Sequence, residues 1–191
     1  MKRIYLIGLF FLMFGLSINI HAQALPAAKR LRAAQVGAGF SFAVPDYGGT
    51  YLKGFTGYAD LDLFRRLALE FDAHFNSVFT PTDIGEDTFL IGPKFSIMRR
   101  GRADIYVKGL GGIGRFHYQK GQYQTYTIPS IHTDTFGVFA IGGGIDFHAS
   151  PHLNVRAIDI EAQDWPSYGT PGHPAHGLTP FVTTFGVGYV F

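Results

Sequence analysis

The end of the sequence, residues 181–191, alternates between large apolar side chains and small ones. The two sets are Phe181, Thr183, Phe185, Val187, Tyr189 and Phe191 against Val182, Thr184, Gly186, Gly188 and Val190. Because successive side chains of a strand point to opposite faces, this pattern predicts a strand with one apolar, aromatic-rich face and one face of small residues. Such a strand at the end of a chain is typical of a closed membrane barrel, whose last strand pairs with its first and leaves no free edge.

The start of the sequence predicts export from the cytoplasm. Lys2 and Arg3 precede an apolar run over residues 4–20, and small residues follow at Ala22 and Ala24. This order is that of a secretory signal peptide, cleaved after Ala24. The alternative is an anchor helix, but the run lies at the short limit of the roughly 17–25 residues that span a bilayer.

Composition limits what the remaining chain can be. Residues 25–32 are predicted to form a short periplasmic segment, and residues 33–191 one barrel domain. Loss of Lys2 and Arg3 with the signal peptide leaves 14 basic residues against 14 acidic ones, so nothing favours binding of nucleic acid. The sequence has no cysteine, which excludes disulfides and thiolate metal sites.

The alternation recurs along the whole mature chain. In residues 67–79 the odd positions from Leu67 to Phe75 are apolar, whereas Glu70 and Asp72 occupy even positions. The same period of two predicts eight strands. Their expected ranges are 34–42, 51–63, 67–79, 89–98, 103–116, 135–147, 153–162 and 181–191.

The connections between these strands alternate in length. Short ones at 64–66, 99–102 and 148–152 alternate with longer ones at 43–50, 80–87, 117–131 and 164–179. Short periplasmic turns and longer external loops are expected of an outer-membrane barrel. The sequence therefore predicts an all-β protein, an eight-stranded antiparallel up-and-down transmembrane β-barrel of the bacterial outer membrane. A soluble periplasmic barrel with an apolar, ligand-binding interior remains an alternative.

At this point the chain resembles the OmpA/OmpX-type outer-membrane β-barrel domain family over residues 33–191. The resemblance is carried by the signal peptide, the eight amphipathic strands, the glycine-rich segments 109–114 and 142–146, and the terminal aromatic strand. It implies a monomeric barrel held in outer-membrane lipid. It also implies recognition by the barrel-assembly machinery through Phe185, Val187, Tyr189 and Phe191.

If the apolar faces meet lipid, the other faces gather charged residues inside the barrel. An eight-stranded barrel is just wide enough for side chains to fill, so these charges must pair with one another. The predicted role is a structural ion-pair plug, with a narrow path for small solutes as the alternative. The polar network is expected to comprise Asp60, Asp62, Glu70, Asp72, His74, Lys94, Lys108, Asp146 and Arg156.

Catalytic and cofactor sites are not predicted. His148, Ser150 and Glu161 invite comparison with outer-membrane lipid A deacylases, but the two former residues fall in a short periplasmic turn and Glu161 near the opposite rim. Residues 109–114 match the dinucleotide-binding glycine pattern only formally, because they lie within a strand.

The two longest loops, 117–131 and 164–179, are the expected sites of an extracellular ligand. His173 and His176 supply only two possible metal ligands, so no metal site is predicted. Aromatic residues flank both loops and are expected in the interfacial belt or in a recognition surface; they are Tyr118, Tyr123, Tyr126, Trp165 and Tyr168. The predicted function is a structural or surface-interaction role.

Overall fold

A computed structural model of the protein describes residues 34–47, 51–79, 84–118, 121–123, 126–128, 132–169 and 175–191. The predicted signal peptide 1–24, its cleavage at Ala24 and the segment 25–32 lie outside these residues. The strands are β1 Ala34–Val44, β2 Leu52–Asp62, β3 Leu67–Phe75, β4 Gly85–Arg100, β5 Ala103–Tyr118, β6 Gly121–Tyr123, β7 Tyr126–Ile128, β8 His132–His148, β9 Leu153–Asp164 and β10 Phe181–Val190. Among the described residues, no helix is long and apolar enough to cross a membrane.

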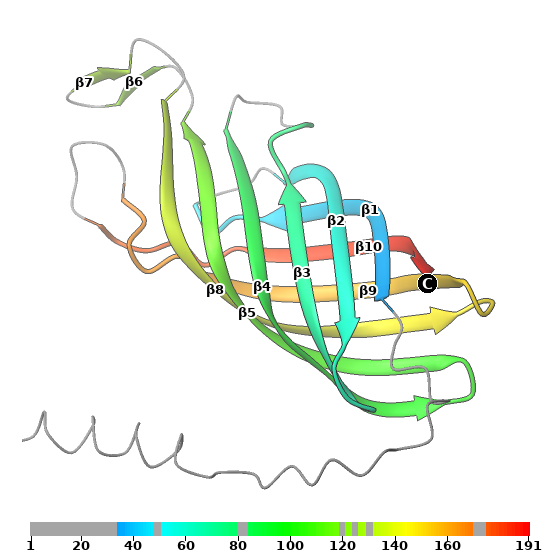
Figure 1. Ribbon diagram of the computed structural model, residues 1–191. Helices are drawn as coiled ribbons and strands as arrows, with labels where there is room; N and C mark the ends of the chain where they lie inside the picture. The colour runs from blue at the N-terminus through cyan, green and yellow to red at the C-terminus, as the bar shows by residue number, and fades with distance from the viewer. Residues whose placement is uncertain are drawn as a thin grey trace, which may run out of the picture. The chain divides into compact units, whose positions relative to one another are not determined.

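Eight of the strands close into a barrel in the order β1-β10-β9-β8-β5-β4-β3-β2 (Figure 1). All neighbouring pairs are antiparallel, and β10 pairs with β1 along its whole length. The backbone N–H of Phe191 donates to the carbonyl of Ala34 at 2.9 Å, next to this seam. The predicted eight-stranded antiparallel up-and-down barrel is confirmed, and so is closure by the terminal strand.

At the end of the barrel where the longer connections begin, the strands are longer than predicted and an additional hairpin is present. β4, β5 and β8 extend beyond their predicted ranges there, because polar side chains tie these extensions together: His117 contacts Asp87 at 3.1 Å and Thr133 at 3.1 Å. Strands β6 and β7 pair as a separate hairpin within the loop 117–131 (Figure 1).

The outer surface of the barrel is apolar. Large hydrophobic side chains such as Phe40, Phe71, Ile91, Ile141 and Phe185 are exposed, and they come from strands all around the barrel. Most of the charged side chains in the middle of β2, β3, β4, β5, β8 and β9 point inward and are buried, whereas β1 and β10 contain no charged residue. This inversion of the usual soluble pattern is what a sheet facing lipid requires.

Two β-bulges interrupt the alternation. In β4, Ser96 is opposite Tyr106 but Met98 is opposite Ile105, so Ile97 is the extra residue. In β9, Arg156 is opposite Asp146 but Ile158 is opposite Ile145, which leaves Ala157 extra. A bulge shifts the inward-facing positions from one parity to the other along the strand.

Inward-facing glycines make room for bulky side chains. A Cβ atom on Gly37 would overlap the ring of Tyr58, and one on Gly114 would overlap the ring of Trp165. At these two positions the structure shows aromatic rings, because the interior holds rings as well as charges.

Candidate functional site

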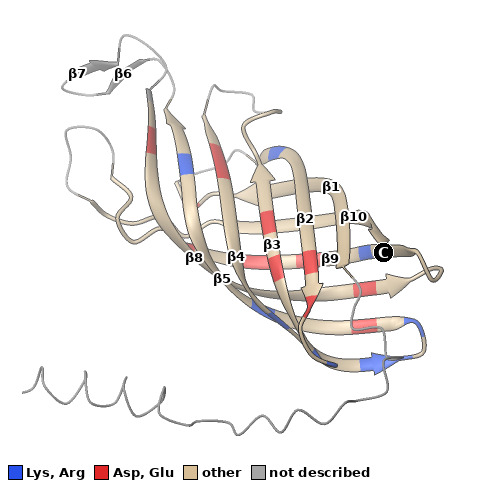
Figure 2. Cartoon of the chain, in the orientation of Figure 1, with Lys and Arg blue, Asp and Glu red and all other residues tan. Residues whose placement is uncertain are grey.

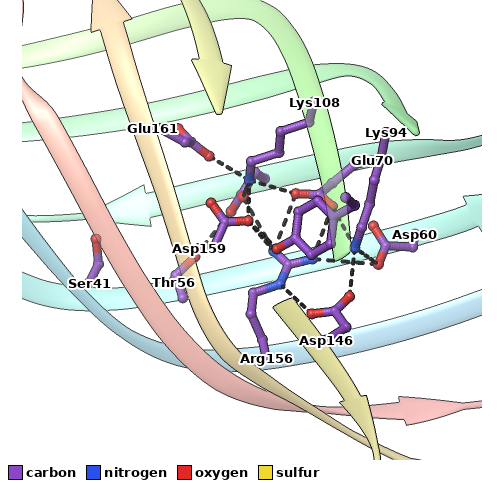
Figure 3. Close-up of polar contacts among 12 residues, drawn as sticks. Ser41, Thr56, Asp60, Glu70, Lys94, Lys108, Asp146, Arg156, Asp159 and Glu161 are labelled. Atoms are coloured by element: carbon purple, nitrogen blue, oxygen red, sulfur yellow. Dashed lines mark hydrogen bonds and ion pairs between the residues drawn. The ribbon is translucent and has the colours of Figure 1, made fainter. Parts of the chain in front are cut away.

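The centre of the barrel interior is occupied by the ammonium group of Lys108. Its Nζ lies 2.8 Å from Glu70, 2.9 Å from Asp72, 2.8 Å from Asp159 and 2.7 Å from Glu161. Lys108 and these carboxylates have no exposed side-chain surface. Figure 3 shows the lysine reaching among several of these carboxylates.

The guanidinium of Arg156 crosses the barrel. It forms a bidentate pair with Glu70, with N–O distances of 3.2 and 2.9 Å. Arg156 belongs to β9 and Glu70 to β3, and these strands are four positions apart in either direction around the barrel. The pair therefore joins opposite walls, and bidentate geometry makes it one of the stronger kinds of ion pair.

A third cation, Lys94, completes the network on the side of the short turns. Its Nζ lies 3.0 Å from Asp60, 3.1 Å from Glu70 and 2.8 Å from Asp146. Glu70 is thus shared by all three cations, since it also pairs with Lys108 and Arg156.

Two aromatic rings pack against the cations. The guanidinium of Arg156 lies 3.7 Å from the centre of the Tyr58 ring, and Nζ of Lys94 lies 3.9 Å from that of Tyr106. The hydroxyl of Tyr106 also donates to Asp159. Contacts of this kind partly replace the hydration that a buried cation loses.

The structure gathers most of the predicted polar residues. Those buried together are Asp60, Glu70, Asp72, His74, Lys94, Lys108, Asp146 and Arg156. Asp62 lies apart from the central contacts, half-buried, and lines a cavity of about 270 Å³ at the end with the short turns.

Asp159 and Glu161 belong to the network but were not predicted. Strict alternation from Arg156 would place odd-numbered residues of β9 on the lipid face, and the bulge at Ala157 reverses this. The signal that could have identified them was chemical: two carboxylates on a lipid-facing strand would be costly.

His74 lies beside the network, and with Asp72 and Glu161 it offers ligand atoms within 4.8 Å of one another. Lys108 already occupies one oxygen of each carboxylate. Thr56 donates to the other oxygen of Asp72 at 3.1 Å, and Gln163 donates to that of Glu161 at 3.1 Å. This arrangement satisfies the carboxylates with protein donors, so we assign the three residues to the ion-pair network.

The deacylase-like residues do not come together. His148 and Ser150 are exposed at the β8–β9 turn, where Oγ of Ser150 accepts hydrogen bonds from the backbone of His152 and Leu153. Glu161 is buried against Lys108. The geometry of an acyl-transfer triad is absent among these three described residues.

Nearer the longer loops, the interior contains a cluster of buried apolar and aromatic side chains. Trp165, Tyr118 and Tyr168 are buried in one cluster with Phe116 and Leu178. The indole N–H of Trp165 donates to Gln163 at 3.2 Å, and the hydroxyl of Tyr118 donates to the carbonyl of Gly169 at 2.7 Å. The expectation of an interfacial belt or recognition surface is wrong for these three aromatic residues, because their rings are buried. For Trp165, the space is left by Gly114 on β5. The side chains of Tyr123 and Tyr126 lie outside the described residues.

Two further sets of residues were singled out in the sequence: the predicted assembly signal of the terminal strand and the two histidines of the last loop. Phe185, Val187, Tyr189 and Phe191 all point outward and are exposed. His173 lies outside the described residues, whereas the ring of His176 packs edge-on against Tyr168 with 5.3 Å between centroids.

Comparison with solved structures agrees with this architecture. Neisserial surface protein A aligns with a TM-score of 0.56 at 14% identity, over 83% of this chain and 96% of that one. The N-terminal β-barrel domain of Pseudomonas aeruginosa OprF aligns with 0.54 at 12%, over 83% and 97%. The attachment invasion locus protein Ail of Yersinia pestis aligns with 0.52 at 15%, over 83% and 98%.

These structures are small outer-membrane barrels, and the likeness concerns the fold. No protein-family model and no curated protein matches the sequence. The prediction of an OmpA/OmpX-type barrel of the bacterial outer membrane is confirmed at the level of the fold.

Proposed function

We propose that this protein is a closed, non-conducting barrel that holds its external loops at the cell surface in a structural or surface-interaction role. One observation carries the proposal: the interior is filled at two levels. A solute would have to pass Arg156 and Lys108, whose side chains have no exposed surface, and then the buried Trp165. The interior of an eight-stranded barrel is just wide enough for such side chains to fill.

The charged interior argues against a soluble periplasmic barrel. Such a barrel would turn its apolar face inward to hold a ligand, whereas here the apolar face is outside and ion pairs fill the centre. In water the exposed apolar surface would drive aggregation, but in lipid it is solvated.

Export and assembly belong to the same proposal. Cleavage after Ala24 would release the mature chain into the periplasm. The outward-facing aromatic residues of β10, ending at Phe191, would then be recognised by the barrel-assembly machinery. The closed sheet, which leaves no strand edge, supports a monomer.

The external loops are the part of the barrel open to partners. As their names state, one structural neighbour is a surface protein and another is an attachment invasion locus protein. In this chain, the loops 117–131 and 164–179 would hold an extracellular ligand. The β6–β7 hairpin gives the first of them regular backbone structure.

The test combines conductance with adhesion, using protein whose fold is first shown by a heat-modifiable shift in electrophoretic mobility. We expect no conductance steps in planar lipid bilayers. We also expect cells expressing the barrel to adhere to cultured cells, and this adhesion to fall when residues 121–128 are replaced by a short turn. Shortening the 43–50 connection, at the same end, is the matched control and should leave adhesion unchanged.

Reproducible conductance steps would instead support a narrow channel for small solutes. Adhesion that survives the replacement of 121–128 would contradict the role of that loop. A soluble protein with no mobility shift would contradict the membrane barrel altogether.

A further inference from the structure

Five arginines gather on two adjacent turns at the end of the barrel that holds its C-terminus. The β2–β3 and β4–β5 connections and the last residues of β4 supply them, and all five are exposed. They are Arg65, Arg66, Arg99, Arg100 and Arg102. We call this group the arginine rim, and Figure 2 shows the blue segments of the β4–β5 turn that belong to it.

Part of the arginine rim encloses a cavity. Arg65, Arg66, Ser96 and Arg99 line a space of about 180 Å³. The two turns are held together here, because the backbone N–H of Ser96 donates to the carbonyl of Arg66 at 2.8 Å. Three arginines line this one small space, and their positive charges attract an anion.

One of these arginines is held in position by its neighbours. Arg99 donates to Asp104 at 2.8 Å and to Oγ of Ser96 at 3.1 Å. A guanidinium has five N–H donors, so most of its donors remain for another acceptor. Of the five rim arginines, Arg99 is the one that forms an ion pair with another described residue, Asp104. Two carboxylates lie beside the five arginines, since Asp104 pairs with Arg99 and Asp62 lines a cavity with Arg66 and Arg99. The rim therefore keeps a net positive charge.

Apolar side chains lie next to the rim. Leu63 and Phe64 precede Arg65 in the β2–β3 turn, and Ile97 and Met98 precede Arg99 in β4; all four are exposed. Apolar side chains followed directly by arginines match the step from hydrocarbon to headgroups in a bilayer.

The opposite end of the barrel has the reverse charge. Among its described residues, Lys53 and Arg115 are outnumbered by carboxylates. Those carboxylates are Asp46, Glu86, Asp87, Asp134 and Asp164. The arginine rim is thus a local feature and not a consequence of a basic chain.

We propose that the arginine rim binds the phosphate of an anionic glycerophospholipid in the periplasmic leaflet. Arginine matches phosphate because its planar fork donates two parallel hydrogen bonds to two oxygens. A zwitterionic headgroup would bring its own ammonium close to the guanidinium groups and be disfavoured. The periplasmic side of this site rests on the proposed membrane placement of the barrel.

The test measures which lipids remain on the full barrel after extraction from a bilayer of equal parts phosphatidylglycerol and phosphatidylethanolamine. Native mass spectrometry of the folded protein counts the bound lipids. A basic residue near an anionic surface contributes about fivefold in binding. We therefore expect a clear phosphatidylglycerol preference, which falls several-fold in the double variant Arg65→Gln/Arg66→Gln. This variant leaves the contacts of Arg99 intact.

The double variant Lys53→Gln/Arg115→Gln is the matched control, because it removes two cations from the opposite end; its preference should equal that of the wild type. Equal retention of both lipids, or a preference that survives in Arg65→Gln/Arg66→Gln, would overturn the inference. Line broadening of inorganic phosphate in ³¹P NMR without a lipid preference would also overturn it, because the site would then take free phosphate.

Failure of this inference differs from failure of the proposed function. A folded, heat-modifiable barrel without a headgroup preference contradicts the lipid site alone. A protein that shows no heat-modifiable form contradicts the membrane barrel itself.

Discussion

The side chain of Lys108 connects two opposite sides of the barrel, β3 and β9. Glu70 and Asp72 reach it from β3, and Asp159 and Glu161 reach it from β9 on the opposite side. Removal of one partner from a buried ion pair lowers the free energy of unfolding by more than the whole pair contributes to it. The reason is that the remaining charges are neither paired nor hydrated.

Replacement of Lys108 by methionine should therefore destabilise the barrel strongly. The side chain volume is nearly kept, but four buried carboxylates lose their common partner, so we expect a loss of about 3–5 kcal/mol. Urea unfolding in detergent measures this, followed by the fluorescence of Trp165, the one tryptophan of the sequence. Lys53→Met changes the same residue type on the exposed face of β2 and should stay within about 0.5 kcal/mol of the wild type. Equal midpoints for the two variants would show that the network does not hold the walls together.

At the scale of elements, the bulge in β9 decides which residues face inward. With Ala157 extra, Arg156 and Asp159 both point into the network although their numbers differ in parity. Deletion of Ala157 would remove the bulge and leave Arg156 and Asp159 two positions apart, so both would still face inward. Deletion of Ile160 from the same strand would instead turn Glu161 toward lipid, which a barrel tolerates poorly. We expect the Ile160 deletion to lose the heat-modifiable form and the Ala157 deletion to keep it.

Ala157→Val is a further control, because it keeps the length of β9 and adds only apolar surface to an exposed position. It should retain the folded form. An Ile160 deletion that folds with an unchanged midpoint would mean that β9 can shift its register without cost.

The same bulge separates what the sequence can predict from what it cannot. Alternation predicted the strands and the inward face of β3, because a period of two is a local property that each strand displays alone. It missed Asp159 and Glu161, because a bulge depends on pairing with β8 and β10. Trp165 was expected in the interfacial belt or a recognition surface because it flanks a long loop. The sequence did not predict its burial, since the space that receives its ring is made by Gly114, which lies on β5.

At the scale of the whole molecule, the pairing of β10, the last strand of the chain, with β1, the first, closes the barrel. The two strands pair along their whole length, so closure does not depend on any single side chain. Recognition of the terminal strand in the cell is a separate process, because the assembly machinery would bind the aromatic side chains of that strand before the barrel has formed. Stability and assembly can therefore be separated by experiment.

The variant Phe191→Ala makes this separation, since it removes an outward ring but keeps the backbone N–H that donates to Ala34. If the ring serves recognition, less protein should reach the outer membrane in cells, whereas purified Phe191→Ala should refold in detergent with nearly wild-type heat-modifiability. Phe64→Ala is a matched control, because both phenylalanines are 72% exposed and Phe64 lies in a turn at the same end of the barrel. Equal outer-membrane yields for the two variants would contradict a role of Phe191 in assembly. A defect of Phe191→Ala in refolding as well would assign that ring to the stability of the seam.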